Sequence, residues 1–190
     1  DLSDGPDDQA IGAAEFKVLL HELKHDLNAY LASTDPQQVR TRTLADVIAF
    51  NAAEPRETAL FGQDIFEQAQ ATGGLDDPDY IQARATSLRL AGPEGIDRLM
   101  RQHRLAALIA PTTSRAWTND PRNEDDMLGS AGQLAAVAGY PHLTVPMGFD
   151  RGMPVGLSFI GGKWDDARIL SLGYAFEQAT QARRPPTPRP

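Results

Sequence analysis

The sequence predicts an α/β fold in which helices pack over a β-sheet. Three short apolar runs, at residues 106–110, 142–146 and 155–160, are bounded by glycine or proline, which is typical of buried strands. Longer stretches with apolar residues at helical spacing precede and follow them, and these predict the covering helices. With 190 residues and 41% hydrophobic content, the chain can form one sizeable core, so a single domain is the default expectation.

A long amphipathic helix is predicted at residues 10–32. Its large apolar side chains fall on one stripe when each residue is rotated by about 100°. They are Phe16, Leu19, Leu20, Leu23, Leu27, Tyr30 and Leu31. This stripe needs a partner surface, because an apolar helix face is stable only where it is covered.

Shorter helices are predicted before the first strand, in the ranges 44–50, 59–71, 78–90 and 94–103. Thr43, followed three residues later by Asp46, resembles a capping box at the start of the first of them. Asp77 can cap the third, whose first residue is Pro78. We expect Gly92-Pro93 to interrupt the chain between the last two.

The C-terminal part predicts a hairpin and two further helices. Glycines and a proline between residues 147 and 154 favour a loop longer than two residues between the second and third strands. Residues 128–138 are rich in small side chains, so we expect a helix that lies buried against the sheet. A final helix is predicted at 165–180, with a buried side formed by Ile169, Leu170, Leu172, Gly173, Tyr174 and Phe176.

Composition excludes several classes of protein. The formal net charge is -8 and no long basic run is present, which argues against nucleic acid or an anionic membrane as a partner. No stretch approaches the roughly 20 apolar residues of a membrane-spanning helix. The chain has no cysteine, so disulfides, a thiolate zinc site and a cysteine nucleophile are excluded, while the cellular compartment stays open.

One short motif matches a known metal site. His21-Glu22-Leu23-Lys24-His25 satisfies the H-E-x-x-H pattern of zinc proteases, in which two histidines on one helix face hold the metal. Both histidines are expected to face solvent, opposite the apolar stripe, whereas a catalytic metal needs a walled cleft. A zinc metalloprotease is therefore a remote alternative, and a solvated histidine face is favoured.

Nucleophilic catalysis has little support from sequence patterns. No serine lies in a G-x-S-x-G elbow. The three lysines, Lys17, Lys24 and Lys163, are not close in sequence to a serine. His103 and His142 lie at a predicted helix end and a predicted strand start, and both are interpreted as structural.

The most site-like segment follows the first predicted strand, at residues 111–120. Ligands bind at the carboxyl ends of strands in open α/β sheets. This segment offers the hydroxyl of Thr112, the indole of Trp117 and the carboxylate of Asp120. Trp117 is the candidate pocket wall, and the alternative is a surface loop whose tryptophan is tucked into the core.

Several segments resemble the amidase signature family, and its peptide amidase branch most of all. They are residues 103–112, residues 138–148 (AGYPHLTVPMG) and residues 153–161 (MPVGLSFIG). The final helix, with YAFEQAT at 174–180, is similar to that family's C-terminal end. Weaker likeness extends back to about Glu15.

The resemblance implies an α/β fold with a mixed β-sheet covered by helices. Residues 1–182 would be the C-terminal portion of the amidase domain, and 183–190 a proline-rich tail. Family members hydrolyse amides with a serine nucleophile, a second serine on a cis peptide bond and a lysine base, all within a Gly/Ser-rich first half. This chain lacks that half, so no catalytic residue is assigned here, and neither a cofactor nor a metal is expected.

The resemblance also implies that this portion completes the sheet and supplies part of the substrate pocket. The candidate substrate-binding residues are Thr112, Trp117, Asp120 and Ser130. The expected partners are the missing N-terminal half of the amidase and a small amide or peptide-amide substrate.

The parent protein is thus expected to be a hydrolase of carboxamides, with peptide C-terminal amides as one substrate class. This chain, a fragment of it, is expected to be inactive by itself. A non-catalytic binding or scaffold module is the alternative. Such a module should be monodisperse, whereas part of an enzyme should expose apolar surface and self-associate.

Overall fold

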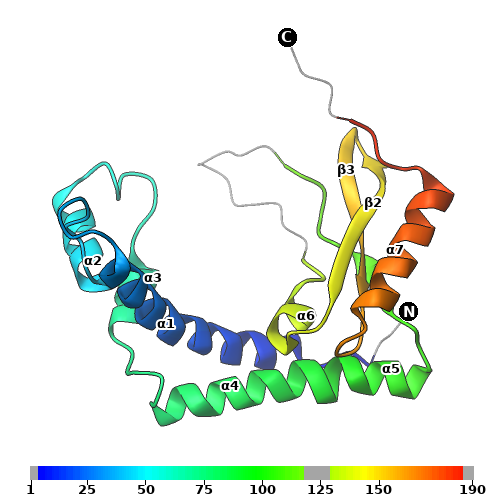
Figure 1. The fold of residues 1–190 in the computed structure, drawn as a ribbon, viewed down its shortest axis with the longest axis horizontal. Coiled ribbons are helices and arrows are strands. Elements are labelled where there is room, and N and C mark those ends of the chain that lie inside the picture. Colours follow the sequence, from blue (N-terminus) through cyan, green and yellow to red (C-terminus); the bar gives the residue numbers. More distant parts are fainter. Residues whose placement is uncertain (1–3, 118–128, 186–190) are drawn as a thin grey trace. The chain divides into compact units, whose positions relative to one another are not determined.

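The computed structural model of the protein describes residues 4–117 and 129–185. The chain forms two compact units (Figure 1). The helical unit is Asp8–Ser87, and the sheet unit combines Asp1–Asp7 with Leu88–Pro190. In the described part of the chain, no helix combines the length and the apolar character needed to cross a membrane.

The helical unit contains α1 (Asp8–Ser33), α2 (Leu44–Ala53), α3 (Asp64–Gln70) and the beginning of α4 (Pro78–Ala91). The capping box predicted for α2 is confirmed, because the Asp46 amide donates to the Thr43 hydroxyl and the Thr43 amide donates to the Asp46 carboxylate. The predicted start of α4 is also confirmed, and the Asp77 carboxylate accepts a hydrogen bond from the Asp79 amide. α3 is shorter than predicted, since it begins only at Asp64.

The interruption expected at Gly92-Pro93 is wrong. α4 continues through a five-residue π-helical turn, η1 (Gly92–Ile96), into α5 (Asp97–His103). Pro93 has no amide proton to continue the α-helical hydrogen bonds of α4, and the chain passes this residue in the wider π-helical turn instead of ending the helix. The backbone amide of Asp97 then donates to the Gly92 carbonyl and closes the wider turn.

The sheet unit is built around three antiparallel strands, β1 (Leu108–Pro111), β2 (His142–Asp150) and β3 (Met153–Ile160), in the order β1-β3-β2. The expected long hairpin loop is wrong. Asp150 pairs with Met153, so the loop is only Arg151 and Gly152, with φ angles of 49° and 82°. Two successive positive φ angles are typical of a type I′ turn, whose twist matches that of the flanking strands. β2 therefore extends past Pro146, with an irregularity between Pro146 and Gly148.

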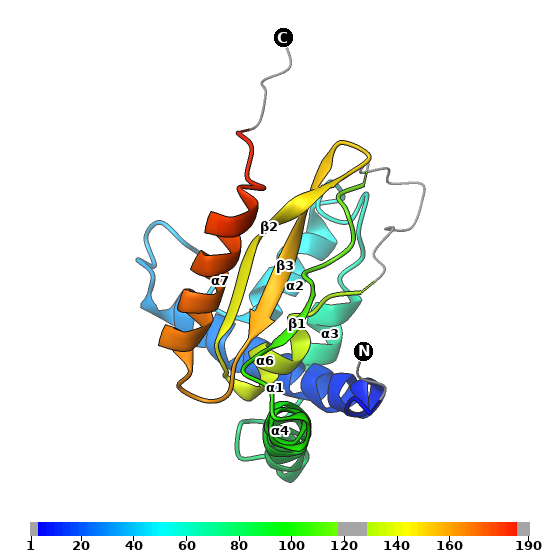
Figure 2. The same ribbon diagram turned by 90° about the vertical axis from the view of Figure 1, so that its right-hand side faces the viewer.

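Opposite faces of this sheet are covered by different helices (Figure 1). α7 (Asp166–Thr180) runs beside the strands in Figure 2 and packs on Val145 and Phe159 through Ile169. On the other face, Ile160 packs with Ile96 of η1 and Ala135 of α6 (Gln133–Ala138). Neighbouring residues of a strand point to opposite faces, so Phe159 and Ile160 belong to these two separate clusters.

Two helix predictions in this unit need correction. Leu170 and Tyr174 of α7 are exposed, because the helix meets the sheet along a narrower stripe than the sequence suggested. α6 begins only at Gln133, and the residues just before it form no helix. The expected burial of this small-residue helix is confirmed at Ala135.

Candidate functional site

A polar patch lies on the sheet face that carries Ile160. Ser158 and Gly156 alternate with the apolar residues of β3, and Thr144 lies directly opposite Ser158 on β2. Thr112 follows β1, and its amide donates to the Gly156 carbonyl at 2.8 Å. The period of two along β2 and β3, with Thr112 placed just after β1, thus brings these polar side chains to one face.

Together with His142 of β2, these side chains form a continuous set of hydrogen bonds, which we call the hydroxyl cluster: Thr112, His142, Thr144 and Ser158. His142 Nε2 lies 2.6 Å from Ser158 Oγ, the Ser158 hydroxyl donates to Thr112 Oγ1 at 2.9 Å, and Thr112 Oγ1 lies 2.6 Å from Thr144 Oγ1. A serine hydroxyl has one proton. Because Ser158 gives that proton to Thr112, His142 must donate from Nε2 to Ser158.

Gly156 makes room for the two threonines. A Cβ atom at this position would lie 2.6 Å from Thr144 Oγ1 and 2.8 Å from Thr112 Oγ1. Both distances are well below van der Waals contact. The hydroxyl pair therefore depends on the absence of a side chain at residue 156.

The contacts of Ser158 decide what the cluster can do chemically. A serine beside a histidine resembles a nucleophile with its base. The Ser158 side chain, however, is 0% exposed and its oxygen is hydrogen-bonded to both His142 and Thr112. The Ser158 oxygen is therefore not accessible to the carbonyl carbon of a substrate. It connects His142 to Thr112 through hydrogen bonds. His142 and Thr144 lie at the exposed side, where an imidazole and a hydroxyl can hydrogen-bond a polar group.

The predicted site residues differ in how close they lie to the hydroxyl cluster. Thr112 is a member of the hydroxyl cluster, and Ser130 lies next to it because Thr113 and Ser130 form an isolated antiparallel bridge. Trp117 is half-buried in the loop that follows. Asp120 lies outside the described residues. Substrate binding by these four residues stays a prediction.

Sequence reasoning missed His142 and Ser158 as site residues. His142 was interpreted as structural, and Ser158 lacks any nucleophile motif. The signal that could have found them is the strand pairing. It requires both the two-residue turn and the irregularity between Pro146 and Gly148, and neither was predicted.

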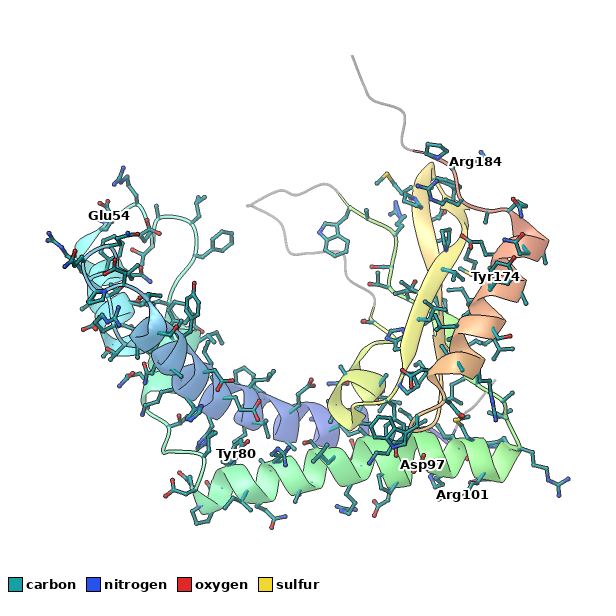
Figure 3. The ribbon with its side chains drawn as sticks, in the orientation of Figure 1. Glu54, Tyr80, Asp97, Arg101, Tyr174 and Arg184 are labelled. Atoms are coloured by element: carbon teal, nitrogen blue, oxygen red, sulfur yellow. The ribbon has the colours of Figure 1, made fainter. Side chains whose placement is uncertain are left out.

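The two histidines of the H-E-x-x-H segment lie in different surroundings. His21 is buried, contrary to the expectation that it faces solvent: its Nδ1 lies 3.3 Å from the Gly74 carbonyl and its ring packs against Tyr80, labelled in Figure 3. The Tyr80 hydroxyl donates to the Glu22 carboxylate at 2.8 Å, and this bond raises the pKa of Tyr80. His25 is exposed as predicted. Among residues 4–117 and 129–185, no three His, Asp or Glu side chains are grouped to hold an ion.

Comparison with known proteins extends over nearly the whole chain. The family model described as Amidase matches residues 9–170. A probable amidase of Arabidopsis thaliana is 34% identical over 178 residues, which cover 92% of this chain and 31% of that protein. The chain therefore spans about a third of the length of this relative.

Solved structures show the same relationship. The native peptide amidase from Stenotrophomonas maltophilia is 48% identical, with a TM-score of 0.86, and the match covers 96% of this chain and 36% of that one. An amidase family protein from Bacillus anthracis str. Ames is 29% identical with a TM-score of 0.71, over 90% of this chain and 30% of that one. The α/β fold of helices over a sheet, here with three antiparallel strands, is thus confirmed as part of the amidase fold. On the family match and these structures together, the chain belongs to the amidase signature family.

Proposed function

We propose that this chain is the C-terminal portion of an amidase that hydrolyses carboxamides, with peptide C-terminal amides as its substrates. The observation that carries the proposal is the 48% identity with a peptide amidase over 96% of this chain. The hydrolysis would pass through an acyl-enzyme on a serine. That serine and its lysine base would lie in the remaining two thirds of the protein.

The proposed contribution of this chain is structural and substrate-binding. Ser158 is buried within the hydroxyl cluster, which supports a role other than nucleophilic attack on the substrate. Thr144 and His142 offer an exposed hydroxyl and an imidazole, and these suit the carbonyl and N–H groups of an amide. Thr112 and Ser130 would complete this wall from the neighbouring segments.

Release of ammonia from a C-terminal peptide amide tests this proposal. We expect none from the 190-residue chain alone. We expect ammonia when the chain is mixed with the part of the Stenotrophomonas maltophilia peptide amidase that it does not match. That part alone is the control.

Two outcomes would contradict the proposal. Ammonia release at an enzymatic rate by the chain alone would place the catalytic groups within it. A stable complex that binds peptide amides and releases no ammonia would instead favour the alternative of a non-catalytic binding module.

A further inference from the structure

The apolar stripe of α1 is only partly covered within the helical unit. Together with α3 it forms an open groove of about 660 Å³. Its apolar lining includes Phe16, Leu19, Leu23, Leu27, Tyr30 and Ile65. Phe16, Leu19 and Tyr30 are 43%, 53% and 65% exposed. A contiguous exposed apolar surface of this kind marks an interaction site.

The polar groups of the groove are already engaged. Its two acidic side chains are Glu22 and Asp26. Glu22 accepts the Tyr80 hydroxyl at 2.8 Å, and Asp26 lies 2.7 Å from His25 Nδ1. Neither carboxylate needs a basic partner, so the groove suits an apolar occupant rather than a cationic one.

The comparisons indicate where such an occupant would come from. The family match begins at residue 9 and includes all of α1 except its first residue, so the groove belongs to the amidase region of the chain. The peptide amidase that resembles it has about two thirds of its length outside the match. That additional polypeptide is long enough to supply an apolar surface over α1.

We propose that the groove between α1 and α3 is the docking surface for an apolar face of the amidase polypeptide outside this chain. The proposal rests on the proposed function, because it takes the rest of an amidase as the partner. Contact along the groove would complete the burial that the α1 stripe requires. It would hold the two parts of the protein together without taking part in the reaction.

Matched charge substitutions test the groove directly. Leu19→Glu places a carboxylate in the groove, where its desolvation opposes docking. Ile81→Glu makes the same kind of change on α4, at a residue that is 55% exposed and does not line the groove. Tyr30→Glu is the second groove variant. All three sites are exposed helical positions, and circular dichroism checks that each variant folds.

The measurement is the affinity of the 190-residue chain for the unmatched part of the Stenotrophomonas maltophilia peptide amidase, carrying a fluorescent label. We expect Leu19→Glu and Tyr30→Glu to weaken binding at least about tenfold, and Ile81→Glu to bind like the unmodified chain. Equal affinity for all four proteins would overturn the proposal, as would no binding by the unmodified chain. A complex that responds to the groove variants but releases no ammonia would overturn the proposed function and leave the docking surface intact.

The groove could instead bind a second copy of this chain, and a separate measurement distinguishes that case. Sedimentation of the chain alone over a range of concentrations shows whether it dimerises. A dimer that Leu19→Glu abolishes, and that excludes the amidase part, would assign the groove to a second copy of the chain and overturn the proposal. A chain that stays monomeric until the amidase part is added would support it.

Discussion

The substitution Gly156→Ala should disrupt the hydroxyl cluster by placing a methyl group against two of its hydroxyl oxygens. The added methyl group would meet Thr144 Oγ1 at 2.6 Å and Thr112 Oγ1 at 2.8 Å, with Thr112 Cβ at 3.3 Å. The first two distances require the threonine side chains to move. Since the hydroxyls of Thr112 and Thr144 are only 2.6 Å apart, moving either one breaks the hydrogen bond between them.

The expected cost follows from three contributions. Overpacking in a closely packed region costs about 1–3 kcal/mol, and the lost hydrogen bond costs about 1 kcal/mol. Replacing glycine by alanine restricts the unfolded chain, which returns about 0.4–1 kcal/mol. We therefore expect the free energy of unfolding of the sheet unit to fall by about 2 kcal/mol.

Urea unfolding followed by tryptophan fluorescence measures this change in the correct unit. The chain has two tryptophans, and both Trp117 and Trp164 belong to the sheet unit. Gly132→Ala is the matched control, because its Cβ would lie 3.5 Å from Ser130 Oγ and 3.8 Å from His142 Cε1, both ordinary contacts. We expect this control to stay within about 1 kcal/mol of the unmodified chain. Equal unfolding free energies for the two variants would refute the steric reasoning.

Two further predictions concern polar groups of the sheet unit. Ser158→Ala leaves the His142 Nε2 proton and Thr112 Oγ1 without their shared partner, so the free energy of unfolding should fall by about 1–3 kcal/mol. The same urea assay measures this change, and an unchanged midpoint would contradict the role of the buried Ser158 hydroxyl. Hydrogen bonds from His103, and then Arg98, hold the pKa of the Asp4 carboxyl below its ordinary value of 3.8. The stabilising contribution of Asp4 is therefore complete above pH 3.8 and is lost as the pH falls through the lowered pKa. The difference in urea midpoint between the unmodified chain and Asp4→Asn should shrink over that acidic range, and a pH-independent difference would contradict this assignment.

Sequence signals predicted where a helix starts when all the residues of the signal lie close together in the chain. Thr43 and Asp46 are three residues apart, and their capping box needs nothing outside α2. Pro78 similarly fixes the start of α4. The prediction that Gly92-Pro93 ends a helix was wrong, because the π-helical turn η1 contains both residues and the helix widens there instead of ending. Whether a proline ends a helix depends on packing around it, and Gly92 and Ile96 are buried.

The buried environment of His21 shows a second limit. A helical stripe calculated from α1 alone places His21 toward solvent. The structure buries it against Tyr80 and the Gly74 carbonyl, more than fifty residues further along the chain. Contacts of that sequence separation leave no periodic signature in either segment, so the sequence pattern could not reveal them.

The amino-acid sequence by itself determined the α/β class, the approximate locations of the three strands but not their ends, and the family, since apolar runs and a 48% identity are properties of the linear chain. Only the tertiary structure decided which strand residues meet. The irregularity between Pro146 and Gly148 shifts the register of β2 on β3, and a shift of one residue moves every side chain to the opposite face of a sheet. The pairing of Thr144 with Ser158, and with it the place of the two β2 side chains His142 and Thr144 in the hydroxyl cluster, exists because that shift puts them on the face of Ser158.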